Sequence, residues 1–488
     1  HPNVEAMSGL LKNPSVRTLF CGGLCASAAS LFSSVLVQRG EFPFVFILGD
    51  LEEAGYFYHD LTQVLGTDKV LFFPSSFRRA IKYGQKDAAN EILRTEVLSR
   101  LQKGEEGLCV VTYPDALAEK VVSRKELGDK TLKPHSGENV DTNFIMEVLR
   151  SYGFEYVDYV YEPGQYAVRG SIIDVFSFSS EFPYRIDFFG DEVESIRTFE
   201  VETQLSKEKK DSIVIVPDLS RSLEQGGASG MVSFLDFLSA DTVLAMRDLL
   251  WLRERIQTVH DETLTPQAIA AREAEESGCI TLDGKLIDGS EFTLRALDFR
   301  RMEFGNKPTG TPDATITFDT SAQPIFRKNF DMVAESFKEY MEKGYALYIC
   351  SDSMKQTDRI RAIFEDRGDQ IAFTAVERTL HEGFADNALR LCIFTDHQLF
   401  DRFHKYNLKS DKARSGKVAL SLKELNQFTP GDYVVHTDHG VGRFSGLVRI
   451  PNGDTTQEVM KLVYQNEDVV FVSIHSLHKV SKYKGKDG

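Results

Sequence analysis

The stretch Thr18–Ser30, TLFCGGLCASAAS, places an apolar strand before a glycine turn and the start of a helix. This order is typical of α/β domains and of the loop that binds nucleotide phosphates, G-x-x-x-x-G-K-[ST]. The stretch keeps the first glycine, Gly23, and the hydroxyl, Ser30. Ala28 stands where the loop has its second glycine, and Ala29 stands where it has its lysine. The sequence therefore predicts an α/β domain whose nucleotide site is degenerate.

A purely structural role for this loop is the stronger interpretation. The next basic residue along the chain is Arg39, near the far end of the expected helix, so no nearby cation replaces the lysine. We expect the two glycines to make a tight turn. Four apolar residues then face the core at helical spacing: Ala28, Leu31, Phe32 and Val35.

Strand and helix patterns alternate from about residue 15 to residue 125. Residues 42–50 (FPFVFILGD), 69–74 (KVLFFP) and 108–113 (LCVVTY) form apolar runs typical of buried strands. Residues 51–66 and 87–104 show helical spacing, and each ends at a glycine. This alternation predicts a mostly parallel sheet with helices on its faces, which we assign to residues 1–125.

The pattern changes to hairpins in residues 126–212, where we expect an α+β insertion. One helix over 141–153 precedes the strands, and P-G at Pro163 and G-D at Gly190 supply turns. The expected strands are 154–161, 171–178, 184–200 and 212–217.

Three further regions complete the expected fold, a multidomain α/β and α+β protein. Residues 213–325 return to mixed helix and strand, and 326–425 hold a further α/β domain of unknown role with a charged linker. Residues 426–488 show short strands broken by glycines, typical of a small SH3- or Tudor-like β-barrel.

Composition limits the possible functions. The 488 residues carry a formal net charge of −16, which disfavours direct binding of nucleic acid by the whole chain and favours a protein partner. Six scattered cysteines without a C-x-x-C pair suit a reducing compartment. No run of about eighteen apolar residues and no secretion signal is present. We expect a cytoplasmic protein, a monomer that contacts no membrane. Because the chain begins with His1 and ends without a closing element, we expect it to be part of a longer protein.

The strand PYRIDFF, residues 183–189, is the best candidate for an interaction surface. Alternation places Ile186 and Phe188 on one face, and Arg185 and Phe189 on the other. Arginine and aromatic side chains are common anchors of protein interfaces, and Arg169 could join the same face. The alternative is a surface arginine–aspartate pair beside an incidentally exposed ring.

Catalytic and metal sites are not expected. The histidines form two H-x-x-H pairs, in which strand geometry points the two rings to opposite faces, so structural histidines are favoured over zinc ligands. The basic residues near 478–486 could touch a phosphate backbone, although a solvated end is the simpler interpretation. No nucleophile elbow, paired-carboxylate pattern or metal triad is present. The histidine pairs are His436 with His439 and His475 with His478.

Two long stretches resemble a known family. Residues 161–206, YEPGQYAVRGSIIDVFSFSSEFPYRIDFFGDEVESIRTFEVETQLS, resemble the domain shared by the excision-repair protein UvrB and the bacterial transcription-repair coupling factors, the Mfd family. Residues 431–447, GDYVVHTDHGVGRFSGL, and 464–483, YQNEDVVFVSIHSLHKVSKY, resemble the CarD-like RNA polymerase interaction domain of that family, which UvrB lacks. The resemblance is therefore to the N-terminal part of a transcription-repair coupling factor.

This resemblance implies the architecture and the location of the motor. The first α/β domain would be a UvrB-like, degenerate RecA-like domain split by the insertion. The ATPase motifs, with their ATP and magnesium, would lie downstream in translocase domains, through which the whole protein would contact DNA. In UvrB an acidic D-E pair organises magnesium, and the corresponding positions here are Arg247 and Asp248. A cation at the first position would damage a second half of the ATP site.

The resemblance also implies two partners. The UvrB-like insertion would recruit UvrA through Arg169, Arg185 and Phe189, the residues that strand alternation turns outward. The CarD-like domain would bind the β subunit of RNA polymerase through Ile450, at a strand end beside a loop. We thus expect an adaptor without catalytic residues, metal or cofactor of its own. The alternatives are a UvrB-type damage-recognition helicase, a CarD-like transcription regulator and a DNA-binding module.

Overall fold

The computed structural model describes most of the chain as two compact units. The first unit consists of residues 1–127 and 223–408, and the second consists of residues 128–222 and 409–488. The insertion thus begins and ends where the chain leaves and re-enters the first unit. The described residues are 1–76, 88–201, 203–219, 230–263, 284–402, 404, 406, 429–436, 439–452, 455–465, 468–473 and 480–483.

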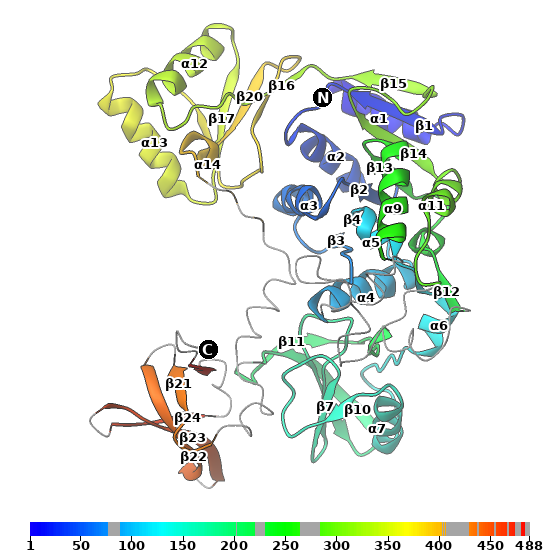
Figure 1. Ribbon diagram of the computed structural model, residues 1–488, viewed down its shortest axis with the longest axis vertical. Coiled ribbons are helices and arrows are strands. Elements are labelled where there is room, and N and C mark those ends of the chain that lie inside the picture. Colours follow the sequence, from blue (N-terminus) through cyan, green and yellow to red (C-terminus); the bar gives the residue numbers. More distant parts are fainter. Residues whose placement is uncertain are drawn as a thin grey trace. The chain divides into compact units, whose positions relative to one another are not determined.

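The first unit contains a seven-stranded parallel sheet with the order β15-β1-β14-β13-β2-β4-β3 (Figure 1). Its strands are short and apolar, and every residue of Phe44–Ile47 is buried, as expected for a sheet covered on both faces. Three of the strands, β13, β14 and β15, follow the insertion in the chain, so the sheet is built from segments on both sides of the insertion. The strands are β1 (Thr18–Gly22), β2 (Phe44–Ile47), β3 (Val70–Phe72), β4 (Cys109–Thr112), β13 (Val243–Met246), β14 (Arg300–Gly305) and β15 (Ala314–Thr317).

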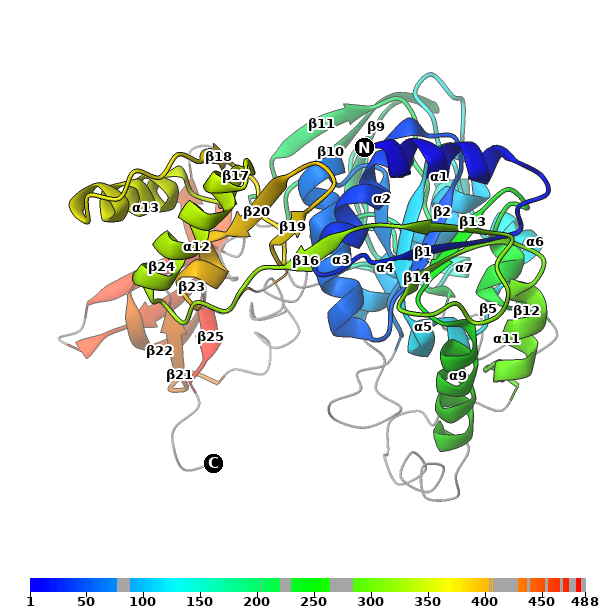
Figure 2. The same cartoon turned by 90° about the horizontal axis from the view of Figure 1, so that it is seen from above.

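Helices cover this sheet, and α9 packs beside α11 (Figures 1 and 2). The expected helix over 51–66 begins where Asp50 accepts a hydrogen bond from the Glu53 amide at 2.9 Å, and it ends before Gly66. The helices are α1 (Pro2–Lys12), α2 (Ala28–Arg39), α3 (Leu51–Leu65), α4 (Ala88–Gln102), α5 (Pro114–Ala118), α6 (Arg124–Asp129), α9 (Leu249–Thr263), α11 (Gly289–Ala296) and the 3₁₀ helix η2 (Phe234–Phe237), with a small sheet of β5 (Val121–Val122) and β12 (Met231–Val232). The described helices include none long and apolar enough to cross a membrane.

Helix α2 is buried more widely than its apolar spacing predicts. Ala28 and Phe32 are buried as expected, but Leu31 and Val35 are only half-buried. Serines on the helix are buried as well, because α1 and α3 both pack against it and the Phe32 ring also meets Phe384 of the following domain at 5.9 Å. The helix therefore lies between several neighbours rather than on one core face.

The insertion is a six-stranded sheet with the order β11-β10-β9-β8-β7-β6 and one helix on its apolar face. The expected strand over 212–217 is wrong. Residues 206–210, SKEKK, pair with β10 instead, whereas Ile213 and Ile215 enter the core next to isolated bridges. The elements are α7 (Thr142–Ser151), β6 (Glu155–Tyr156), β7 (Gln165–Arg169), β8 (Ile172–Val175), β9 (Tyr184–Phe189), β10 (Glu192–Phe199) and β11 (Ser206–Lys210).

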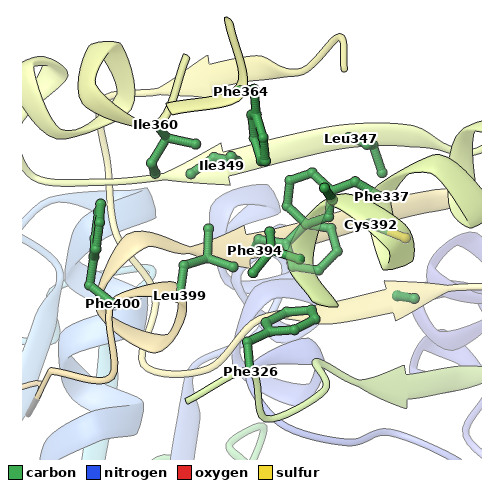
Figure 3. Close-up of a cluster of buried hydrophobic side chains, with 13 residues drawn as sticks. Phe326, Phe337, Leu347, Ile349, Ile360, Phe364, Cys392, Phe394, Leu399 and Phe400 are labelled. Carbon is green, nitrogen blue, oxygen red and sulfur yellow. The ribbon is translucent and has the colours of Figure 1, made fainter. Parts of the chain in front are cut away.

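A second α/β domain follows the first in the same unit. Its five-stranded sheet has the order β16-β19-β20-β17-β18, and an aromatic core fills the space under its helices. Figure 3 shows this core, in which the rings of Phe337 and Phe394 meet with centroids 4.3 Å apart. The elements are β16 (Thr320–Ala322), α12 (Phe330–Glu342), β17 (Ala346–Cys350), α13 (Met354–Asp366), β18 (Thr374–Val376), β19 (Phe384–Asp386), β20 (Leu391–Thr395) and α14 (Asp396–Leu399).

The C-terminal region is a five-stranded antiparallel sheet with the order β24-β23-β22-β21-β25. Six buried residues, among them Phe444 and Met460, form its core. A register shift between Phe444 and Leu447 interrupts the pairing of β22 near glycines that the sequence predicts between the short strands of this region. The strands are β21 (Tyr433–His436), β22 (Gly440–Asn452), β23 (Thr455–Val463), β24 (Val469–Ser473) and β25 (Val480–Lys482).

Candidate functional site

The phosphate-type loop joins β1 to α2, and its first glycine is required by the backbone. Gly23 has φ of 77°, and a Cβ atom at this position would lie 1.9 Å from the Phe318 carbonyl oxygen. No other residue type fits so close to a neighbouring backbone. The tight turn expected at this position is confirmed.

Backbone groups of this loop are hydrogen-bonded to the second α/β domain. The Cys25 amide donates to the Thr320 hydroxyl at 3.1 Å, and that hydroxyl donates to the Gly23 carbonyl at 2.6 Å. The Ser27 amide donates to the Glu382 carbonyl at 3.3 Å, while the Glu382 amide donates to the Ser27 hydroxyl oxygen at 2.9 Å. In a nucleotide site such loop amides point at phosphate oxygens. Here the amides of Cys25 and Ser27 already have partners within the chain.

The hydroxyl at the magnesium position, that of Ser30, also has hydrogen-bond partners within the chain. Ser30 is buried, and its hydroxyl lies 2.7 Å from an Asp60 carboxylate oxygen and 2.9 Å from the Ser27 carbonyl. Burial raises the pKa of Asp60 to about 6, against the lowering effect of its hydrogen bonds from Ser27, Ser30 and the His381 backbone. With Ala29 at the lysine position, these residues do not fit a magnesium-bound phosphate.

Arg247 and Asp248, which follow β13, have structural partners. The Arg247 guanidinium lies 3.0 Å from the Glu53 carboxylate of α3, and both side chains are partly exposed. The Asp248 carboxylate accepts a hydrogen bond from the Trp251 amide at 3.0 Å, as an N-terminal cap of α9 does.

On the face of the insertion sheet opposite its helix, two arginines bind one buried carboxylate, that of Asp174. Asp174 on β8 is fully buried and accepts hydrogen bonds from Arg185 Nε at 2.8 Å and Arg185 Nη2 at 2.9 Å. It also accepts one from the Arg169 guanidinium, on the neighbouring strand β7. The structure thus brings Arg169 and Arg185 to the same face, as the sequence predicts. Both bind Asp174, a residue that strand alternation did not single out.

Phe189 stands at the end of the same strand as Arg185, on the same face. Burial follows the predicted alternation, because Ile186 and Phe188 lie in the core while Phe189 is 78% exposed. Asp187 also lies on this face. We name Arg169, Asp174, Arg185 and Phe189 the β9 face.

Arg185 is mostly buried and is more than a surface contact. Its side chain is 14% exposed, its guanidinium lies 4.5 Å from the centre of the Phe199 ring, and its Nη1 donates to the Gln204 carbonyl at 3.1 Å. Arg185 does pair with an aspartate, as the alternative expects, but the pair is buried and its partner is Asp174. The available signal was the polar Asp174 within the apolar strand SIIDVFSF.

Ile450 lies in β22, two residues before its end, and pairs with Gln457 of β23. The predicted strand end beside a loop is met only approximately, because two more paired residues, Pro451 and Asn452, follow Ile450 in the strand. Its side chain lies outside the part of the chain that the structure describes.

The first histidine pair departs from the expected geometry. His436 is buried at the end of β21, and its ring centroid lies 4.7 Å from that of the exposed His439. The rings come together because His439 lies in the turn after the strand, where strand alternation no longer applies. His475 and His478 lie outside the described residues. Within the described ranges, no group of three or more metal-ligating side chains could hold a metal ion.

Comparison with known proteins identifies two domains. The model of the UvrB interaction domain matches residues 132–220, and the model of the CarD-like/TRCF RID domain matches residues 428–484. The chain is 22% identical over 538 residues to the transcription-repair-coupling factor of Bacillus subtilis (strain 168), covering 96% of this chain and 45% of that protein. It is 23% identical over 528 residues to that of Staphylococcus aureus (strain bovine RF122 / ET3-1), covering 94% of this chain and 45% of that protein. The chain thus spans less than half the length of these curated relatives, and the resemblance inferred from its sequence is confirmed.

Proposed function

Because this chain is homologous to the N-terminal part of the transcription-repair-coupling factors along nearly its whole length, we propose that it is the adaptor part of such a factor. The CarD-like domain binds the β subunit of RNA polymerase stalled at a DNA lesion. The UvrB-like insertion recruits UvrA for nucleotide excision repair. Within this proposal, the protein acts in the cytoplasm, as a monomer.

The observation that carries this proposal is the presence of both interaction domains in one chain. The β9 face adds a physical reason for the UvrA side. Phe189 offers a large exposed ring on the same face of the sheet as two guanidinium groups, and aromatic and arginine side chains are enriched among the residues that contribute most to binding in protein interfaces. A protein partner suits this face better than a small ligand, because Phe189 projects from a strand end.

Phe189→Ala tests the UvrA contact. The ring is 78% exposed, so its removal leaves the fold intact and we expect at least a tenfold loss of UvrA capture. The matched control is Phe144→Ala on α7, a ring that is 52% exposed and lies on the helix covering the opposite, apolar face of the sheet. Equal UvrA capture by the Phe189→Ala variant and the unmodified chain would contradict the assignment.

Arg185 positions the β9 face rather than serving as a free contact. Reversing its charge would place a carboxylate against the buried Asp174, so loss of UvrA capture would then report misfolding. Arg169, whose side chain is about one third exposed at 34%, is the better arginine to substitute. We expect Arg169→Gln to weaken UvrA capture less than Phe189→Ala does.

Ile450 provides the polymerase contact in this proposal. Its position near the end of the β22–β23 hairpin favours docking onto another protein. We expect Ile450→Asp to abolish capture of the RNA polymerase β subunit while UvrA capture continues, and Phe189→Ala to show the reverse. Joint loss of both partners in either variant would indicate unfolding, and retained polymerase capture by a folded Ile450→Asp variant would sink the assignment.

We also propose that this segment hydrolyses no nucleotide and binds no ATP or magnesium. The absent lysine, the internal partners of the Cys25 and Ser27 amides and the Arg247–Glu53 pair support this. ATP-driven translocation along DNA then belongs to the part of the full-length protein downstream of this chain. Isothermal titration with Mg-ATP provides the test: we expect no binding heat, and micromolar affinity would overturn the proposal.

A further inference from the structure

Helix α3 forms a joint with described residues of the second α/β domain and the chain that follows it, within 379–402 and at 404 and 406. The Asp60 carboxylate accepts a hydrogen bond from the His381 amide at 2.7 Å. The Tyr56 hydroxyl donates to the His404 carbonyl at 2.8 Å, and the Tyr56 ring stacks on the His381 ring with centroids 3.4 Å apart. Tyr406 packs so closely on α3 that a Cβ atom at Gly55 would lie 2.4 Å from its ring.

Four imidazole rings meet inside this joint, one from α3 and three from the second domain. His404 is at their centre. Its ring stacks on His397 with centroids 4.1 Å apart and lies 5.0 Å from His59. Its Nδ1 lies 3.4 Å from the Nδ1 of His381. We name His59, His381, His397 and His404 the imidazole cluster.

The environment of the cluster opposes protonation. The Nε2 atoms of His59 and His404 are buried without a hydrogen-bond partner in the described structure. A proton added to either atom would therefore create an N–H group that has no acceptor. Burial, followed by the neighbouring histidines, lowers the pKa of His381 to about 4 and that of His404 to about 3. Burial likewise lowers the pKa values of His59 and His397.

The acidic groups around the cluster offset only part of this effect. Asp396 is paired with Arg402 at 2.6 Å, and its other carboxylate oxygen lies 3.8 Å from His397 Nδ1. Glu382 lies 3.8 Å from His381 at the more exposed edge. Asp352 acts on His59 and His397 only through space. Burial raises the pKa of Asp60 to about 6, so this carboxylate becomes neutral before the buried imidazoles accept protons. The exposed Glu52 of α3 acts electrostatically on Tyr56.

We infer that the imidazole cluster makes this joint a pH-sensitive latch, closed while the rings are neutral and opened by their protonation. Like charges on rings 4.1 to 5.6 Å apart repel one another strongly in surroundings that water enters poorly. Once the joint opens, the rings become solvated and accept protons near the ordinary imidazole pKa of about 6.5. Asp60 acts in the opposite direction, because its raised pKa lets the closed state hold one extra proton, but four imidazoles outweigh this single carboxylate. The open state therefore binds more protons in total, and the joint loses stability as the pH falls below about 6.5 toward the lowered values in the closed state.

Spin labels on the two sides of the joint test this latch. Cysteines replace the exposed Ser15 before β1 and the exposed Glu365 on α13, in a chain whose Cys25 and Cys279 are changed to serine. Pulsed electron paramagnetic resonance then measures the distance between the labels at pH 7.5 and pH 5.0. We expect one narrow distance at pH 7.5 and a second, longer population of at least half the molecules at pH 5.0, reversible on return. An unchanged distance, or loss of the far-ultraviolet circular dichroism signal before the distance changes, would overturn the inference.

A double variant separates charge from packing. Phenylalanine at positions 381 and 404, H381F with H404F, keeps both rings stacked but removes two of the titrating groups. We expect this variant to stay closed at both pH values. The matched control is His135→Gln, which removes an exposed histidine of the insertion and leaves the transition unchanged. The latch is refuted if the double variant opens at pH 5.0 like the unmodified chain, or if it is already open at pH 7.5.

Discussion

Replacing Asp174 with asparagine removes the one negative charge between Arg169 and Arg185 while keeping the side-chain volume. The carboxylate is fully buried and accepts two hydrogen bonds from Arg185 at 2.8 and 2.9 Å, besides the one from Arg169. An asparagine has one acceptor oxygen, and its NH₂ group would face a guanidinium. Breaking a buried ion pair by removing one partner costs about 3–5 kcal/mol. We expect about 3 kcal/mol, the lower end, because about a third of the Arg169 side chain, 34%, remains in contact with water.

Hydrogen exchange measures this loss where it occurs. Amides of β8 and β9 exchange when this sheet opens, so a loss of about 3 kcal/mol accelerates their exchange by about a hundredfold, at 1.36 kcal/mol for each factor of ten. Exchange followed by mass spectrometry on peptides that contain these strands provides the measurement in the full chain. Peptides from β17 and β20 of the second α/β domain should keep their rates.

Asp187→Asn is the matched control for this prediction, because it makes the same chemical change on the same face. Asp187 is partly exposed, and its nearest guanidinium, that of Arg197, lies 3.6 Å away. Such pairs contribute less than about 1 kcal/mol, so exchange should accelerate less than about fivefold. Equal acceleration in the two variants, or less than fivefold in Asp174→Asn, would refute the central role given to the buried carboxylate.

Three further outcomes are expected. Gly23→Ala should lower the free energy of unfolding by about 3 kcal/mol or more in urea titrations, since its Cβ would overlap a backbone oxygen. Gly40→Ala is the control: this glycine also has a positive φ, but no atom lies within 4 Å of an added Cβ, so the loss should be about 1 kcal/mol. Phe337→Ala should cost about 3–5 kcal/mol and accelerate hydrogen exchange in β17 and β20 while sparing β8 and β9, because the ring is fully buried in the core of the second α/β domain. Burial raises the pKa of the Cys21 thiol to about 12, so iodoacetamide at pH 8.5 should modify the half-buried Cys25 at least tenfold faster, as judged by peptide mass spectrometry.

The regular elements of the first α/β domain follow from local patterns in the sequence. The strands and helices expected between residues 42 and 113 are all present, because apolar runs bounded by glycines are local signals. The prediction of a strand over 212–217 was wrong. Its alternating isoleucines, Ile213 and Ile215, do pack in the core, but the backbone that carries them is irregular and makes only isolated bridges. The polar stretch 206–210 became the strand instead, since its backbone completes the edge of the sheet next to β10.

The candidate site was only partly predictable for a similar reason. Strand alternation correctly predicted that Arg185 and Phe189 lie on one face. This prediction requires only that successive side chains of a strand point to opposite faces. Asp174 was missed because its importance comes from pairing between strands, which alternation along one strand does not show. The bonds from Thr320 and Glu382 to the glycine loop were missed because about 300 or more residues separate the partners. Contacts of such separation leave no periodic signal in the sequence.

The bonds between the glycine loop and the second α/β domain also limit any attempt to rebuild a nucleotide site. Thr320 and Glu382 are tethered to the loop by the chain itself, so they compete with a free ligand at an effective concentration on the order of millimolar or higher. A lysine restored at position 29 would add one attractive charge but leave this internal competitor in place. An engineered site must therefore also displace the segment that carries Glu382.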